Sequence, residues 1–167
     1  MNLKITSITI TDAIQLDKVQ RTFEAFPPDY SAFDTETTGL HIIYDKPFLF
    51  QFGWINLESE RLFTFVVDIE LRPGLADMVI KWWHEAVLQC RVYAGHNVKY
   101  DLHMMENIGY PYRGNNITDT MIYIRAGMDN IPTRAGGTPL GLKDYTVRYI
   151  DKSAKIHEKK LKAERTQ

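Results

Sequence analysis

Alternating apolar and polar residues mark several short segments of the chain, and this two-residue period is typical of half-buried strands. The pattern predicts strands over residues 4–11, 30–36, 48–55, 62–69 and 92–94, with a further short strand beginning at Ile117. The second, third and fourth of these segments follow one another closely, so they predict an antiparallel start to a sheet.

Apolar residues at helical spacing predict helices between and after these strands. They cover the segment from Asp12 to Pro27-Pro28, then 73–90, 100–107, 120–126 and 140–150. Asp12 and Pro73 are typical of helix starts, and Gly109 is typical of a helix end. Residues 127–141 are rich in Gly, Pro, Thr and Asn and predict a surface loop. A helix between two strands implies a parallel crossover, so we expect an α/β fold with a mixed sheet flanked by helices.

The length of 167 residues and the 44% content of apolar residues predict a single domain with its own core. The lone cysteine, Cys90, excludes an internal disulfide framework and a cysteine-cluster zinc site, and it fits a reducing compartment. The sequence contains neither an apolar run of the roughly 18 to 20 residues that a membrane span needs nor a signal-peptide core. We therefore expect a soluble, cytoplasmic protein with no membrane partner.

A formal charge of −1 excludes a polycation that binds nucleic acid by bulk attraction. The charge is nevertheless uneven, because residues 152–167 hold six Lys and Arg against two acids. A solvated helical face is the favoured interpretation of this tail, and a phosphate contact is the alternative.

Two acids, Asp34 and Glu36, stand at the end of the apolar segment 30–36, within Phe-Asp-Thr-Glu-Thr-Thr-Gly-Leu. Residues i and i+2 of a strand point to the same side, so the two carboxylates would face one point in space. Such a pair repels unless a cation joins it, and ligands that are all oxygen favour Mg²⁺ or Mn²⁺ over zinc. The alternative is a turn or cap role for Asp34 and a solvated surface position for Glu36.

A third acid, Asp101, lies in the segment Gly-His-Asn-Val-Lys-Tyr-Asp, where a short strand turns into a helix. If this strand lies beside segment 30–36, Asp101 faces Asp34 and Glu36 across a shared cleft and completes a three-carboxylate metal site. The alternative is an aspartate that stabilises the helix dipole.

The two segments together resemble the first two motifs of the DnaQ-like DEDD 3′→5′ exonucleases, above all the proofreading domain of family A, Klenow-type DNA polymerases. The similarity extends to the predicted elements along the whole chain. It implies a ribonuclease H-like three-layer fold with a mixed five-stranded sheet. It also implies hydrolysis of single-stranded DNA from the 3′ end to nucleoside 5′-monophosphates.

Site roles follow from the same resemblance. Asp34 would bridge two divalent ions, Mg²⁺ or Mn²⁺, Glu36 would hold the first ion with it, and Asp101 would bind the second. Leu40 would wedge against the terminal base, and Asn97 and Tyr100 would line the substrate strand. Thr37 and His96 complete the implied substrate-binding set. The alternatives are core packing for Leu40 and Tyr100 and turn chemistry for Asn97.

The fourth acid of the family pattern is missing from this chain. The family requires an aspartate four residues after a Tyr or a His, and the downstream aspartates 119, 129, 144 and 151 follow Asn, Arg, Leu and Val instead. His96 and His103 belong to the second motif and do not replace it. We expect the chain to be the N-terminal part of a longer polymerase, cut before its third exonuclease motif and its polymerase domain. A stand-alone relative that has lost the residue is the alternative, and in both cases weak metal binding is expected.

Two other functions stay open at this stage. A non-catalytic module of the same fold would bind single strands or a partner without cutting, as the missing acid suggests. His41, Tyr44 and Tyr100 would suit either idea, since stacking on unpaired bases is not itself catalysis. An RNA-directed relative of the ribonuclease D kind is the third candidate, because fold alone does not decide the substrate.

Overall fold

The computed structural model describes residues 3–126 and 141–149. It divides into two compact units, Met1–Asp119 and Thr120–Gln167. The second unit contributes two described helices, α4 (Thr120–Ala126) and α5 (Leu142–Tyr149), both where helices were predicted. The predicted loop over 127–141 and the basic tail lie outside the described residues, apart from residue 141. The expectation of a single domain, truncated before a third motif, stays a prediction.

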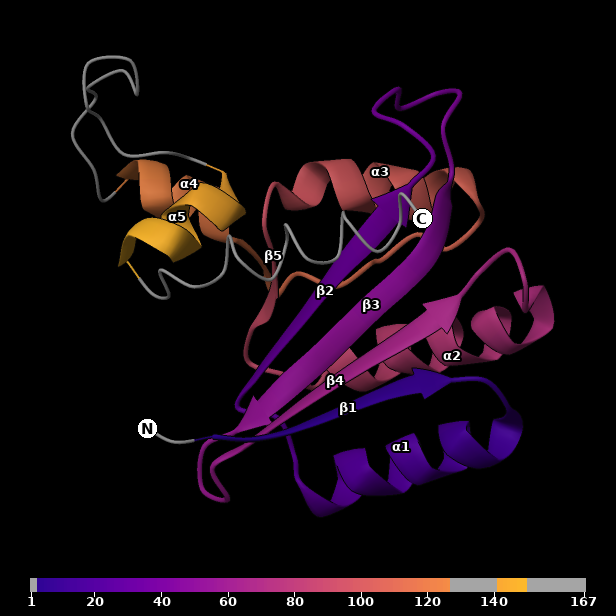
Figure 1. Ribbon diagram of the computed structural model, residues 1–167, viewed down its shortest axis with the longest axis vertical. Helices are drawn as coiled ribbons and strands as arrows, with labels where there is room; N and C mark the ends of the chain where they lie inside the picture. Colours follow the sequence, from indigo (N-terminus) through magenta and orange to yellow (C-terminus); the bar gives the residue numbers. More distant parts are fainter. Residues whose placement is uncertain (1–2, 127–140, 150–167) are drawn as a thin grey trace, which may run out of the picture. The chain divides into compact units, whose positions relative to one another are not determined.

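The first unit is built on a mixed six-stranded sheet of order β1-β4-β3-β2-β5-β6 (Figure 1). Its strands are β1 (Lys4–Ile10), β2 (Tyr30–Thr37), β3 (Pro47–Asn56), β4 (Arg61–Asp68), β5 (Tyr93–Gly95) and β6 (Ile117–Asp119). Strands β2, β3 and β4 are antiparallel neighbours, whereas β1 pairs with β4, β5 with β2 and β6 with β5 in parallel. The α/β fold class is therefore confirmed. The sheet has one strand more than the expected five, because the three-residue β6 also pairs.

Three helices connect the strands of this unit, and each has a recognisable start or end. Helix α1 (Ala13–Ala25) begins where the Asp12 carboxylate accepts a hydrogen bond from the Gln15 backbone N–H at 2.8 Å. Helix α2 (Pro73–Val87) begins at its proline and ends three residues before the predicted Cys90. Helix α3 (Val98–Asn107) begins two residues earlier than predicted and is followed by Gly109 at a positive φ of 92°.

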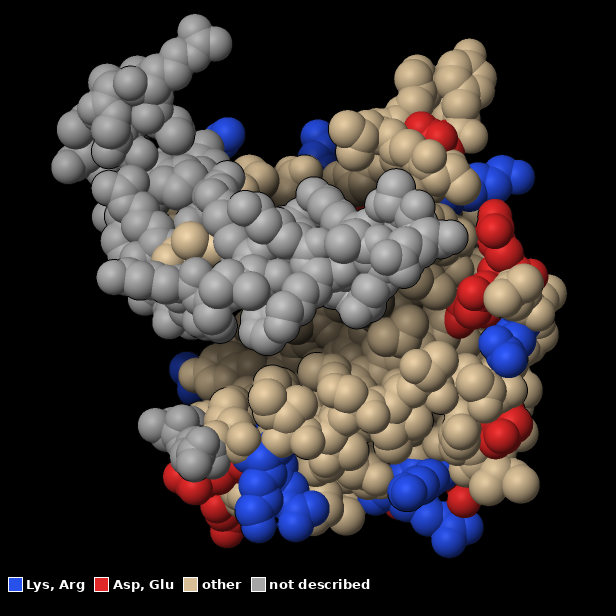
Figure 2. Space-filling view, viewed as in Figure 1, with Lys and Arg blue, Asp and Glu red and all other residues tan. Residues whose placement is uncertain are grey.

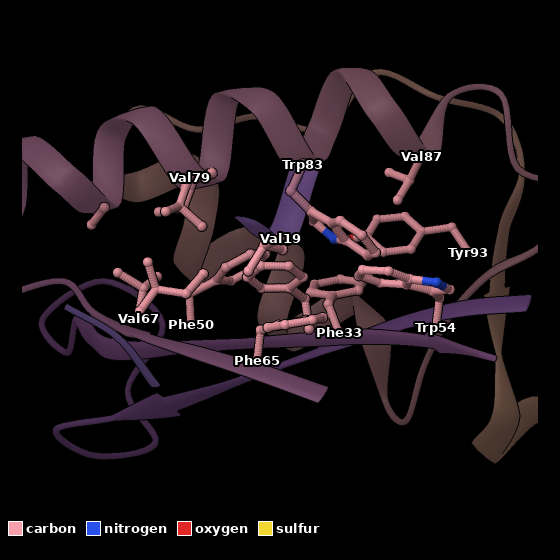
Figure 3. Packing of buried hydrophobic residues seen from close by; sticks show 14 of the residues in the cluster. Val19, Phe33, Phe50, Trp54, Phe65, Val67, Val79, Trp83, Val87 and Tyr93 are labelled. Carbon is pink, nitrogen blue, oxygen red and sulfur yellow. The ribbon is translucent and has the colours of Figure 1, made fainter. Parts of the chain in front are cut away.

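The core of the unit lies between one face of the sheet and α2, and it is dominated by aromatic rings (Figure 3). Trp83 of α2 is fully buried, packs 4.5 Å from the Phe52 ring and donates its indole N–H to the Tyr93 hydroxyl at 3.0 Å. Leu16 and Val19 of α1 belong to the same cluster. Cys90 is buried and its thiol is free of a disulfide.

All three helices of the first unit cover the same face of the sheet. Val98 of α3 shares the core cluster with the residues of α1 and α2 and with Phe33 of β2. Along β2, Ser31, Phe33 and Thr35 are buried, whereas the residues between them are exposed. Of the three layers that the resemblance implies, the first unit shows the sheet and the helices on one of its faces. The third layer stays a prediction. Among the described residues, no helix is both long and apolar enough to span a membrane.

Candidate active site

Asp34 and Glu36 lie on the face of the sheet opposite the three helices, as their spacing predicted. Gln51 of β3 stands directly opposite Asp34 in the antiparallel register and therefore shares its face. The Gln51 side-chain amide donates to a Glu36 carboxylate oxygen at 3.3 Å. The sheet thus places two carboxylates and one amide together at the carboxyl end of β2.

Asp101 reaches β2 from the helix side and bonds the residue between the two exposed acids. Its Oδ1 accepts a hydrogen bond from the Thr35 backbone N–H at 3.0 Å and another from the Thr35 hydroxyl at 2.5 Å. Strand β5 pairs with β2 only as far as Ala32, so the edge of β2 beyond that point has no strand neighbour on this side. The Asp101 carboxylate takes the place of that neighbour and joins the two predicted motifs directly.

Burial affects the pKa of Asp101, a residue that is 5% exposed. Removal from water raises the pKa of this carboxyl above its ordinary value, and the negative charge of Asp119 raises it further. The two hydrogen bonds from Thr35 oppose this rise, because they stabilise the ionised form. The structure therefore holds a carboxylate whose negative charge is costly without a cation.

Tyr100, next to Asp101 on α3, holds the chain that leaves β2. Its hydroxyl donates to the Gly39 carbonyl at 2.6 Å and lies 3.0 Å from the Thr37 hydroxyl, which itself donates to the Gly39 carbonyl. A shift in the strand register between Glu36 and Thr37 marks the same point. Thr37 and Tyr100, both predicted substrate contacts, are thus brought together.

The loop over 38–46 presents apolar side chains while its backbone is tied down. The Asp45 carboxylate accepts from the Thr38 hydroxyl at 2.9 Å and from the His41 backbone N–H at 2.7 Å. Leu40 is 87% exposed, so it is not a core residue, and Tyr44 lies 4.5 Å from the His41 ring, measured between ring centroids. The loop is accordingly a fixed platform with an exposed apolar tip.

The turn between β5 and α3 is held by a residue that the sequence did not single out for the site, Asp119 of β6. Its two carboxylate oxygens accept hydrogen bonds from the backbone N–H groups of Asn97 at 3.0 Å and Val98 at 3.1 Å. Asn97 is exposed in the left-handed region and forms no side-chain cap of its own, whereas His96 is half-buried. The sequence offered one signal for Asp119, which is an acid at the end of the short strand predicted to begin at Ile117.

Comparisons with solved structures find proteins that share the fold of this chain. Brucella melitensis NrnC matches with a TM-score of 0.51 at 18% sequence identity, over 90% of this chain and 62% of that chain. The same protein with bound Mg²⁺ matches with a TM-score of 0.50 at 18% identity, over 90% of this chain and 63% of that chain. The catalytic core of RRP6 from Trypanosoma brucei matches with a TM-score of 0.56 at 15% identity, over 88% of this chain and 34% of that chain.

These neighbours are DEDD-type 3′→5′ exonucleases. At these identities the likeness shows a shared fold: the chain has the RNase H-like α/β fold of these neighbours. It spans less than two thirds of the length of each of these proteins. No family model matches the sequence, and no curated protein does either.

The donor set of the candidate site fits a hard divalent cation in its chemistry. Asp34, Glu36 and Asp101 offer only oxygen ligands, which Mg²⁺ and Mn²⁺ prefer. Within residues 3–126 and 141–149, however, no three His, Cys, Asp or Glu side chains are arranged to hold one ion. Asp34 and Glu36 leave β2 on its exposed face, and the Asp101 carboxylate lies at the edge of the same strand, on the Thr35 backbone N–H and hydroxyl.

Proposed function

We propose that this chain is a 3′→5′ exonuclease domain that hydrolyses single-stranded nucleic acid from the 3′ end to nucleoside 5′-monophosphates. The Asp101–Thr35 link carries the proposal, because it joins the two predicted motifs at one strand end. Motif-like sequences that fell at unrelated places in the fold would have no such link. The RNase H-like fold and the Mg²⁺-bound NrnC structure support the same chemistry.

Asp34 and Glu36 would hold the first of two divalent ions, and Asp34 and Asp101 the second. When bound, the ions would lower the pKa of the attacking water and neutralise charge on the departing 3′ oxygen. Tyr100 and Thr37 would fix the chain after β2, and Leu40 would rest against the terminal base. Gln51 donates a hydrogen bond to Glu36, and Thr35 donates one to Asp101. These bonds orient two of the three carboxylates before a metal ion binds.

The electrostatic surface supports a local site rather than broad attraction. On the described part of the face in Figure 2, Lys and Arg side chains lie among Asp and Glu side chains, and neither sign covers a broad area. Broad attraction to phosphates requires many basic contacts. The bound ions and the loop over 38–46 would supply contacts with the strand end.

DNA is the proposed substrate, in the role of proofreading for a polymerase domain in the same longer chain. The sequences Phe-Asp-Thr-Glu-Thr-Thr-Gly-Leu and Gly-His-Asn-Val-Lys-Tyr-Asp support this choice, since they resemble the family A proofreading motifs. An RNA-directed exonuclease is the second candidate, because the neighbours by fold include RNA-related nucleases.

The test is degradation of 5′-labelled single-stranded DNA and RNA of the same sequence with Mn²⁺. We expect stepwise shortening from the 3′ end, faster on DNA, and a loss of at least about a hundredfold in Asp34→Ala. Asp17→Ala, which removes an exposed acid of α1 that pairs with Arg21, is the matched control and should cut at the parent rate. Faster cleavage of RNA would favour the second candidate.

In the proposed longer protein a downstream motif would supply the fourth acid, so the assay is also run on a chain extended to include that motif. Cleavage by the extended chain alone would support a truncated proofreading domain. Absence of Asp34-dependent cleavage in both would contradict the exonuclease and favour a binding module of the same fold.

A further inference from the structure

No role described so far explains the position of Asp119 or its hydrogen bonds. It ends β6 and stands beside Gly95 in the parallel register of β5 and β6. Each of its carboxylate oxygens accepts a backbone N–H from the turn that leads into α3. The cap of α3 therefore comes from a strand 21 and 22 residues further along the chain, not from the residue that precedes the helix.

The turn that Asp119 holds is tightly shaped. Asn97 adopts φ 60° and ψ 41°, a left-handed conformation that is uncommon for residues other than glycine. A Cβ atom at Gly95 would lie 2.8 Å from a Val98 methyl group, so the chain has little freedom there. Hydrogen bonds from two amides to one carboxylate, at the positive end of a helix, are strong compensation for such a conformation.

The first turn of α3 carries the side chains that reach β2. Asp101 lies three residues after Val98 and bonds Thr35, and Tyr100 lies two residues after it and bonds Gly39. A shift of the helix register by one residue would rotate these side chains by about 100° around the helix axis. Helix ends without a cap fray, and Asp101 lies within the turn that would fray.

We propose that Asp119 is a positioning residue of the nuclease site: by fixing the first turn of α3, it sets the place of Asp101. This inference rests on the proposed function, since it assigns Asp101 to a metal site. Asp119 does not need to touch the metal or the substrate. Its effect passes through the backbone of Asn97 and Val98 to the carboxylate that Thr35 holds.

The test measures two properties of the full chain, Mn²⁺ affinity and the hydrogen exchange of the amides of residues 97–101. In Asp119→Ala, we expect Mn²⁺ binding to weaken about tenfold or more and these amides to exchange faster. Asp119→Asn keeps one acceptor oxygen and should lie between the parent and Asp119→Ala in both measurements. Asp68→Ala is the matched control, because Asp68 also accepts a backbone N–H, from Leu71 at 2.7 Å, and it should change neither.

Unchanged Mn²⁺ affinity in Asp119→Ala would overturn the positioning role. So would equal weakening in Asp119→Asn and Asp119→Ala with unchanged amide exchange, because the lost charge alone would then account for it. A parent chain whose Mn²⁺ binding survives Asp34→Ala would instead overturn the proposed function, and the positioning role with it. The Asp34→Ala measurement thus separates failure of the site from failure of Asp119.

Discussion

Successive residues of β2 point to opposite faces of the sheet, and the two faces have different tasks. Phe33 points into the core, where its ring stacks 4.6 Å from the Tyr93 ring, whereas Asp34 points to the opposite, exposed face. The first face stabilises the fold by burial, and the second concentrates negative charge that does not stabilise it. Thr35 belongs to the buried face but serves the site, because its hydroxyl and N–H hold Asp101.

This difference shows how a rigid strand supports a charged site. The aromatic packing on the helix side fixes the strand, so the acids on the other side are held at a fixed spacing without contributing to the core. Substitutions on the two faces should therefore separate stability from activity.

Phe33→Ala and Asp34→Ala test the comparison most strongly. Phe33→Ala should lower the free energy of unfolding by about 3–5 kcal/mol, because it leaves a cavity beside Tyr93. Asp34→Ala should leave the unfolding free energy unchanged or slightly higher, since it removes one of two neighbouring acids. Urea unfolding of both variants without metal measures this, and an Asp34→Ala chain that unfolds would contradict the division of tasks.

A second prediction concerns the pH dependence of stability that His84 of α2 causes on the helix side of the sheet. Burial lowers the pKa of His84, which packs against the Phe50 and Tyr112 rings, to about 4. The unfolded chain binds this proton near pH 6.5, so stability is fully present above that pH and is lost as the pH falls towards 4.

Between pH 7 and pH 5 the His84 contribution should fall by about 2 kcal/mol. Urea unfolding of the parent and of His84→Leu at both pH values isolates it. The parent should lose more stability than the variant on acidification, and an equal loss in both would show that His84 is protonated in the fold.

Thr35 lies between the two tasks, and its hydroxyl can be removed alone. Thr35→Val keeps the backbone N–H bond to Asp101 but loses the shorter bond, so it should cost about 1–2 kcal/mol of stability. It should also weaken Mn²⁺ binding, because Asp101 loses one of its two orienting donors. Thr35→Ser restores the hydroxyl and should restore both properties; a serine variant that behaves like valine would contradict the role of the bond.

Asp101→Asn should have the smallest effect on stability, and in the favourable direction. The amide oxygen of the asparagine can accept both hydrogen bonds from Thr35. The variant also carries no charge, so it avoids the cost of burying a carboxylate, which is the cost that raises the pKa of Asp101. The melting temperature without metal should rise slightly at neutral pH, while Mn²⁺-dependent cleavage is lost. A lower melting temperature would show that the ionised carboxylate stabilises the fold.

The sequence predicted those features that depend on local patterns. Alternation placed Asp34 and Glu36 on one face, and the Asp12 cap and Pro73 were recognised as helix starts. The start of α3 was placed two residues late, because its cap comes from Asp119, on a strand distant in sequence. Likewise, no local signal shows that Asp101 bonds residue 35, since the bond depends on β5 lying beside β2 and ending early.

The central claim is that Asp34, Glu36 and Asp101 together form the divalent metal site. Anomalous diffraction from crystals of the full chain soaked in Mn²⁺ tests it most directly. We predict a manganese peak at about 2.1 Å from carboxylate oxygens of Asp34 and Glu36, with Asp101 directed towards a second peak or its bound water. Saturating Mn²⁺ that gives no peak at Asp34, or only peaks at other acids, would contradict the claim.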